Sequence, residues 1–197
     1  PNSNANSLYL QWADQFGASG NDFDLYVVDN AGNVLASSTN TQSGSQNPNE
    51  VVSFNAANGT QAHIIVDYVG GGAAPAVFFD LRGFSGFSNW EYLVRAGSVN
   101  GASRQSEVYA AGAAFQGTPN TLQSSSSRGP ARHFFPAQLT RMKPDGVCVD
   151  GVSVTGVGGF GAGTCPAVNA GDCQFFGTSA STPHVAGLAA LLLEVEP

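Results

Sequence analysis

The first hundred residues alternate between short apolar runs and small polar clusters. The runs are rich in β-branched and aromatic residues, and several alternate apolar with polar positions, as strands with one buried face do. The breaks, such as DNAGN at 29–33 and AANGT at 56–60, contain the Gly and Asn of tight turns. The expected strands are SLYLQWA (7–13), DFDLYVVD (22–29), EVVSFNA (50–56), TQAHIIVDY (60–68), PAVFFDLRG (75–83) and WEYLVRA (90–96). Short strands at this spacing predict an antiparallel β-sandwich or jelly roll.

The second half has a different pattern. The segment EVYAAGAA, residues 107–114, is predicted to be a buried strand. Residues 185–193 are apolar on every side, which predicts a buried helix over 178–193 with Pro183 in its first turn. The expected fold class is mostly β with an α/β remnant at the C-terminus. The small polar stretch at 95–102 divides the chain into predicted domains at 1–97 and 98–197.

Ser179 is the candidate nucleophile, because it lies in a small-residue turn at the start of the predicted helix. The unpaired N–H groups and the positive dipole end of a helix N-terminus suit an oxyanion that develops beside a nucleophile. The competing interpretation of the bare Gly-Thr-Ser triplet is a helix N-cap, for which serine is among the preferred residues.

The longer string from Gly177 to Gly187, GTSASTPHVAG, resembles the nucleophile segment of subtilisin-like serine proteases. Two further landmarks of that family resemble SSRGP at 126–130 and KPD at 143–145, in the family's order, and 107–114 resembles the buried strand before them. The resemblance covers roughly residues 96–197. It implies that Ser179 forms the acyl-enzyme and that its own backbone N–H donates to the oxyanion.

A serine nucleophile needs a base and a group that orients the base, and neither is evident in this chain. His184 follows Pro183 inside the family motif, where the resemblance implies a structural role, and neither His63 nor His133 is followed by Gly-Thr, the context of the family's catalytic histidine. The resemblance therefore places the catalytic Asp and His, and the asparagine oxyanion donor, upstream of Pro1. We expect the chain to be part of a secreted subtilisin-like endopeptidase that acts on peptide or protein substrates, and to be inactive when isolated.

Two rival serine-hydrolase patterns fit less well. The nucleophile elbow of lipases and esterases needs Gly-x-Ser-x-Gly, but its fifth position is Ser181 here. A Ser–Lys dyad would have to use Lys143, the only lysine, which the KPD landmark explains better.

Composition narrows the function classes. The chain of 197 residues has a net charge of −7 and only seven basic residues, which makes nucleic-acid binding improbable. The apolar run at 185–193 is too short for a membrane helix, so no membrane partner is expected. If strands that cover the C-terminal half are absent, the exposed apolar face would drive self-association.

The β-rich half offers its own candidate chemistry. The hairpin from Asp22 to Asn33 resembles the small β-sandwich modules attached to many secreted bacterial proteases, and Asp22, Asp24 and Asp29 could offer carboxylates to a weak calcium site. The alternative is that these aspartates are turn and surface residues. No other cofactor is expected.

The aromatic residues Trp12, Phe16, Tyr26 and Trp90 form either a binding platform or part of the core. The alternative function is therefore a binding or adhesion module on a degenerate, non-catalytic protease scaffold.

The three cysteines are assigned by their context. Cys165 and Cys173 bracket a polar loop just before the nucleophile, and in an extracellular protein they are expected to form a disulfide. Cys148 then remains a buried thiol in a strand. A metal site lacks a fourth ligand and any Cys-x-x-Cys spacing.

Overall fold

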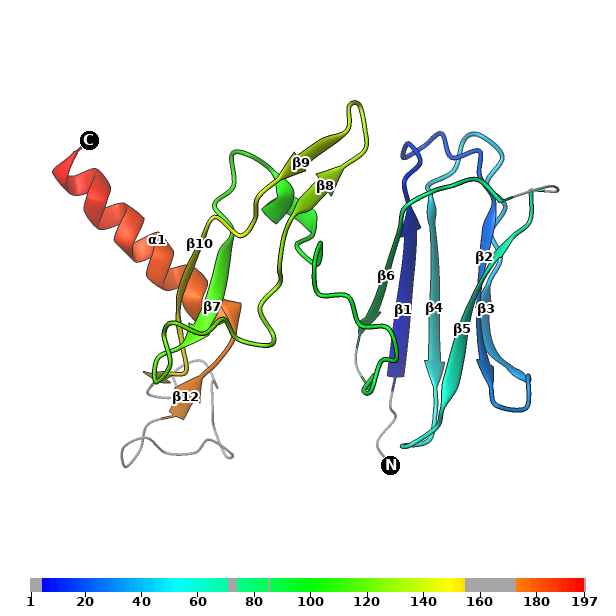
Figure 1. The fold of residues 1–197 in the computed structure, drawn as a ribbon, viewed down its shortest axis with the longest axis horizontal. Coiled ribbons are helices and arrows are strands. Elements are labelled where there is room, and N and C mark those ends of the chain that lie inside the picture. The colour runs from blue at the N-terminus through cyan, green and yellow to red at the C-terminus, as the bar shows by residue number, and fades with distance from the viewer. Residues whose placement is uncertain (1–4, 71–73, 85, 155–172, 197) are drawn as a thin grey trace. The chain divides into compact units, whose positions relative to one another are not determined.

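The computed structural model describes residues 5–70, 74–84, 86–154 and 173–196, which are mostly β with one C-terminal helix (Figure 1). The chain divides into two compact units. The first comprises Pro1–Leu93 with Phe134–Gln138, and the second comprises Val94–His133 with Leu139–Pro197. Whether 1–97 and 98–197 are separate domains remains a prediction.

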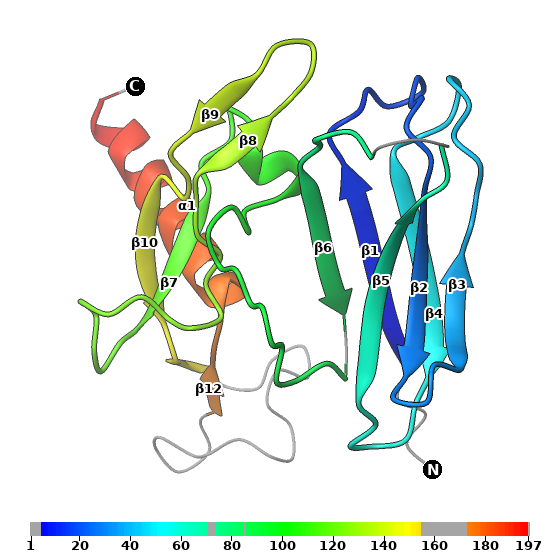
Figure 2. The same ribbon diagram turned by 45° about the vertical axis from the view of Figure 1, so that its right-hand side comes forward.

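The first unit consists of two three-stranded antiparallel sheets. Its strands are β1 (Ala5–Trp12), β2 (Phe23–Asp29), β3 (Val34–Ser38), β4 (Asn49–Asn55), β5 (Ala62–Tyr68) and β6 (Phe79–Phe84). One sheet has the order β4-β1-β6 and the other has the order β3-β2-β5 (Figures 1 and 2). Antiparallel pairing is therefore confirmed for these strands.

Alternate residues of the two central strands form the core of the first unit. The buried cluster contains Leu8, Leu10 and Trp12 of β1, Phe23, Leu25 and Val27 of β2, and Val52 of β4. Successive strand residues point to opposite faces, so the period-two pattern of the sequence becomes one apolar layer. The rings of Trp12 and Phe23 meet edge to face with centroids 5.3 Å apart. The Trp12 indole N–H donates to the Ser19 hydroxyl over 3.2 Å, which satisfies its polar atom.

A buried carboxylate joins the start of β4 to the segment after β3. Glu50 is fully buried, and each of its oxygens accepts two hydrogen bonds. Oε1 accepts from the Asn40 backbone N–H at 3.1 Å and from the Gln42 amide at 2.8 Å. Oε2 accepts from the Asn40 amide at 2.8 Å and from the Ser38 hydroxyl. These bonds compensate the desolvated charge and fix the 38–42 segment.

One predicted strand of the β-rich half is wrong. Residues 90–96 form no extended strand, and Tyr92 and Val94 remain 84% and 74% exposed. Its one β contact among the described residues is an isolated bridge between Ala96 and Arg128, so the apolar composition of this segment does not produce a ladder. The structure also contains β3, which the sequence patterning did not single out.

In its described residues, the second unit has one parallel strand pair, two antiparallel strand pairs, a 3₁₀ helix and one α-helix. Its elements are a 3₁₀ helix (Gly101–Arg104), β7 (Ala111–Phe115), β8 (Ala131–His133), β9 (Leu139–Arg141), β10 (Gly146–Asp150), β11 (Val152–Val154), β12 (Cys173–Phe175) and α1 (Thr178–Val195). Strands β7 and β10 pair in parallel, whereas β8–β9 and β11–β12 are antiparallel. Helix α1 packs against β7 and β10 (Figures 1 and 2).

The predicted C-terminal helix is confirmed, but two details of its prediction are wrong. Pro183 is the sixth residue of α1 and therefore lies in its second turn. On either side of this proline, two side chains donate to carbonyls of the first turn. The Thr182 hydroxyl donates to the Thr178 carbonyl, and the His184 Nδ1–H donates to the Ala180 carbonyl. The helix is also largely exposed, and its buried residues are Ala180 and Ser181. The reason is that β7 and β10 cover only its first turns in the described part of the chain.

Candidate functional site

The candidate nucleophile lies at the junction of β12 and α1. Gly177 caps the helix with φ +93°, a left-handed backbone value that glycine adopts without strain. Ser179 is the second helical residue and is exposed, whereas Ala180 and Ser181 after it are 1% and 0% exposed. The helix start is therefore packed at Ala180 and Ser181, while Ser179 remains accessible to solvent.

The first turn of α1 has backbone N–H groups beside Ser179. The N–H groups of Ala180 and Ser181 both donate to the Gly177 carbonyl, over 2.9 and 3.3 Å. The earlier N–H groups of the helix, that of Ser179 among them, have no acceptor within the helix. Together with the positive dipole end, they can stabilise a negative charge next to the hydroxyl.

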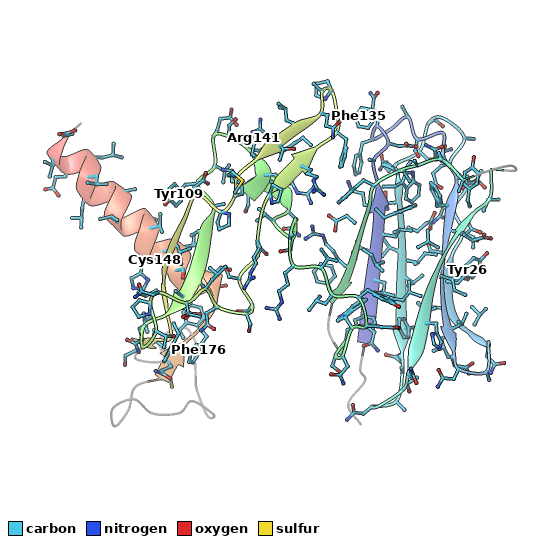
Figure 3. All side chains as sticks on the ribbon, viewed as in Figure 1. Tyr26, Tyr109, Phe135, Arg141, Cys148 and Phe176 are labelled. Atoms are coloured by element: carbon cyan, nitrogen blue, oxygen red, sulfur yellow. The ribbon has the colours of Figure 1, made fainter. Side chains whose placement is uncertain are left out.

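Two side chains tie the nucleophile turn to strand β10, and the sequence patterning missed both. The Ser181 hydroxyl lies 2.9 Å from the Cys148 carbonyl and 3.2 Å from the Val149 carbonyl. The buried Asp150 carboxylate accepts the Gly177 N–H at 2.7 Å. The available signal was a charged residue directly after an apolar run, in GVCVDG at 146–151. Figure 3 labels Cys148 on β10 and Phe176 in the residues before α1.

The two upstream landmarks are close together in the second unit. A Cβ on Gly129 would collide with the Lys143 carbonyl, so only glycine fits this approach. The Lys143 ammonium is buried and donates to the Val108 carbonyl and to the Asp145 carboxylate, each over 2.7 Å. The Ala110 N–H and Lys143 together lower the pKa of Asp145 below its ordinary value. Lys143 is therefore engaged in a structural pair, which argues against the Ser–Lys dyad.

Each histidine has a hydrogen-bond partner other than Ser179. His63 bonds the Asn30 side chain at 2.9 Å, and His133 bonds the Arg104 carbonyl at 3.0 Å. The Nδ1–H of His184 donates to the Ala180 carbonyl at 2.7 Å, within its own helix. Among the residues that the structure describes, none of the three hydrogen bonds Ser179.

The structure does not bring the three candidate calcium ligands together. Asp22 directly precedes β2 and Asp29 is its last residue, so they lie about 23 Å apart at the ordinary rise of a strand and cannot share one ion. Asp22 accepts the Gln42 N–H, and Asp29 accepts the backbone and side-chain N–H groups of Asn33. The described residues contain no group of three or more His, Cys, Asp or Glu that could hold a metal ion.

Asp24, the third candidate calcium ligand, accepts a hydrogen bond from a neighbouring tyrosine. The Tyr26 hydroxyl, labelled in Figure 3, donates to Asp24 at 2.9 Å, and this bond raises the pKa of Tyr26. Trp12 is buried in the core, so a surface platform that includes it is not formed. For Trp12, the interpretation as a core residue is therefore the correct one.

Two of the three cysteines lie on described strands, Cys148 on β10 and Cys173 on β12. Cys148 carries a free thiol on β10 and is partly buried rather than fully buried. Cys165 lies outside the described residues, so its pairing with Cys173 remains a prediction.

An exposed serine at a helix N-terminus is one part of the arrangement that a serine-type peptidase requires. Residues 3–197 match the family model described as the subtilase family. The chain therefore belongs to the subtilase family, which implies a serine-type peptidase. No curated protein and no solved structure matches the chain.

Proposed function

We propose that this chain supplies the nucleophile of a secreted subtilisin-like serine endopeptidase, and that Ser179 is that nucleophile. The observation that carries the proposal is the exposed Ser179 hydroxyl at the N-terminus of α1, in a chain that the subtilase model matches over 3–197. The catalytic Asp and His come from residues outside this chain, because the histidines present are engaged elsewhere.

The proposed reaction is acyl transfer from a peptide bond. The Ser179 oxygen attacks the scissile carbonyl carbon while its proton passes to the external histidine. The carbonyl oxygen becomes an oxyanion, to which the Ser179 backbone N–H donates. The C–N bond then breaks, the histidine returns the proton to the leaving amine, and water hydrolyses the acyl-enzyme. This chemistry uses side chains and backbone groups and requires no cofactor.

The exposed face of α1 supports the external origin of the catalytic partners. Leu188, Leu191, Leu192 and Leu193 are 59–66% exposed. Parallel strands such as β7 and β10 normally occur in larger sheets whose two faces are both covered. We propose that the segment contributing the catalytic histidine also covers this face, and that the isolated chain self-associates through it.

The first unit is proposed to be a β-sandwich module inserted in the catalytic domain. Its two three-stranded sheets share one core, as two packed sheets do. No helix among the described residues is long and apolar enough to cross a membrane. Secretion accords with the polar, weakly charged composition, and the net charge of −7 favours peptide over nucleic-acid substrates.

A fluorophosphonate probe and a fluorogenic peptide test the proposed function. The isolated chain should show neither labelling nor hydrolysis, since loss of triad members costs on the order of 10⁴- to 10⁶-fold in rate. The protein that also contains the upstream segment should be labelled at Ser179 and should hydrolyse the peptide, and Ser179→Ala should abolish both. Robust labelling of the isolated chain would refute an external base. An inactive longer protein would refute the peptidase assignment and favour a degenerate scaffold.

A further inference from the structure

The nucleophile turn is attached to strand β10 at two points, one on each side of Ser179. Before it, the Gly177 N–H donates to Asp150 Oδ2 over 2.7 Å. After it, the Ser181 hydroxyl donates to the carbonyls at the end of β10, at 2.9 and 3.2 Å. The attached residues are four positions apart, which is about one helical turn. The two bonds therefore restrain both the position and the rotation of the turn that contains the nucleophile.

The strand that receives these bonds is itself well held. All five residues of β10 pair with β7, from Gly146 with Ala111 to Asp150 with Phe115. The acceptors for the turn are the carbonyls of Cys148 and Val149 and the side chain of Asp150, which are consecutive residues. The end of β10 therefore holds the start of α1 in a defined position.

The Asp150 side chain is positioned by residues from the loop after β7. It is 1% exposed, and its second oxygen, Oδ1, accepts the Gln123 amide N–H at 3.1 Å. Its backbone carbonyl accepts the Gln116 N–H at 3.0 Å. Oδ2 lies at the N-terminus of α1, where the helix dipole favours a carboxylate.

We propose that Asp150 and Ser181 are positioning residues that fix the direction in which Ser179 presents its hydroxyl. This inference rests on the proposed function of Ser179. Neither side chain transfers a proton or touches the substrate; both act by holding the turn. Small displacements of a reacting group reduce rates steeply, so the anchors should affect the chemical step more than substrate binding.

The test in the active enzyme compares three variants with a matched control. Ser181→Ala and Asp150→Ala should each lower kcat and the rate of fluorophosphonate labelling roughly 10- to 100-fold, with KM unchanged. Asp150→Asn should recover kcat to within about threefold, because its amide oxygen can still accept the Gly177 N–H and the Gln123 amide can turn to match. The control is Ser126→Ala. It also removes a buried hydroxyl, which accepts the Ala113 N–H at 3.1 Å and makes none of the bonds that hold the nucleophile turn.

A second measurement uses this chain alone and requires no activity. Amide hydrogen exchange of Gly177 should accelerate about tenfold in Asp150→Ala, and much less in Asp150→Asn or Ser126→Ala. Unchanged exchange in Asp150→Ala would overturn the anchor. An active enzyme in which Ser181→Ala and Asp150→Ala behave like Ser126→Ala would overturn the positioning role alone. An inactive unsubstituted enzyme would overturn the proposed function and, with it, the catalytic meaning of both anchors.

Discussion

Replacement of Glu50 is the most direct test of the buried polar network in the first unit. Glu50→Ala removes an acceptor of four hydrogen bonds from a site with no solvent exposure. The Gln42 amide and the Asn40 backbone N–H then lose their partner. Unsatisfied buried donors cost about 1–3 kcal/mol each, so the expected loss is about 3–5 kcal/mol in the free energy of unfolding.

The isosteric Glu50→Gln variant should cost less, for a reason that the geometry provides. Its remaining oxygen can stay in the Oε1 position and keep the Asn40 N–H and Gln42 bonds. Its new NH₂ group then faces the Ser38 hydroxyl, which can accept, and the exposed Asn40 amide, which can turn to water. We expect a loss of about 1–2 kcal/mol.

Tryptophan fluorescence during urea unfolding measures this effect selectively. Both tryptophans, Trp12 and Trp90, belong to the first unit, so the signal reports that unit alone. The exposed Glu91 of the same unit provides a charge-matched control, and Glu91→Gln should change the free energy of unfolding by less than about 0.5 kcal/mol. Glu50→Ala within about 1 kcal/mol of the unsubstituted chain, or Glu50→Gln as damaging as Glu50→Ala, would refute the reasoning.

Three further predictions concern the second unit. Because the pKa of Asp145 is lowered on folding, its contribution to stability is present above the unfolded pKa of about 3.9 and is lost as the pH falls through the lower folded pKa. As the pH is lowered, the free energy of unfolding should therefore fall less for Asp145→Asn than for the unsubstituted chain. Parallel curves of unfolding free energy against pH for the two proteins would contradict this prediction. A non-reduced digest should contain a peptide linking Cys165 to Cys173, whereas a link from either to another cysteine would disprove the pairing. Replacing the exposed Leu188 and Leu192 with Glu should reduce self-association in analytical ultracentrifugation, and a monomeric unsubstituted chain would argue against the apolar face as its cause.

The sequence predicted where the candidate nucleophile lies, but not which residues of β10 hold its turn. The string around Ser179 predicted the helix and the place of the candidate nucleophile at its start, because small residues, a proline and an apolar run are local signals. The bond from Gly177 to Asp150 joins residues 27 positions apart, and that from Ser181 to Cys148 joins residues 33 apart. No local pattern specifies such partners, because the contact depends on how β10 and α1 pack together in the tertiary structure.

The sequence by itself determined the antiparallel strands that form the core of the first unit and the existence of the C-terminal helix. The alternation of Leu8, Leu10 and Trp12 marks one buried face, because side chains of a strand point alternately to its two sides. Only the tertiary structure decided whether an apolar segment is buried. Among the described residues, 90–96 pair only at the single Ala96–Arg128 bridge, and most of α1 has no covering layer. The physical reason is that periodicity fixes which face of an element is apolar, whereas burial depends on residues far away in the chain that arrive to cover that face.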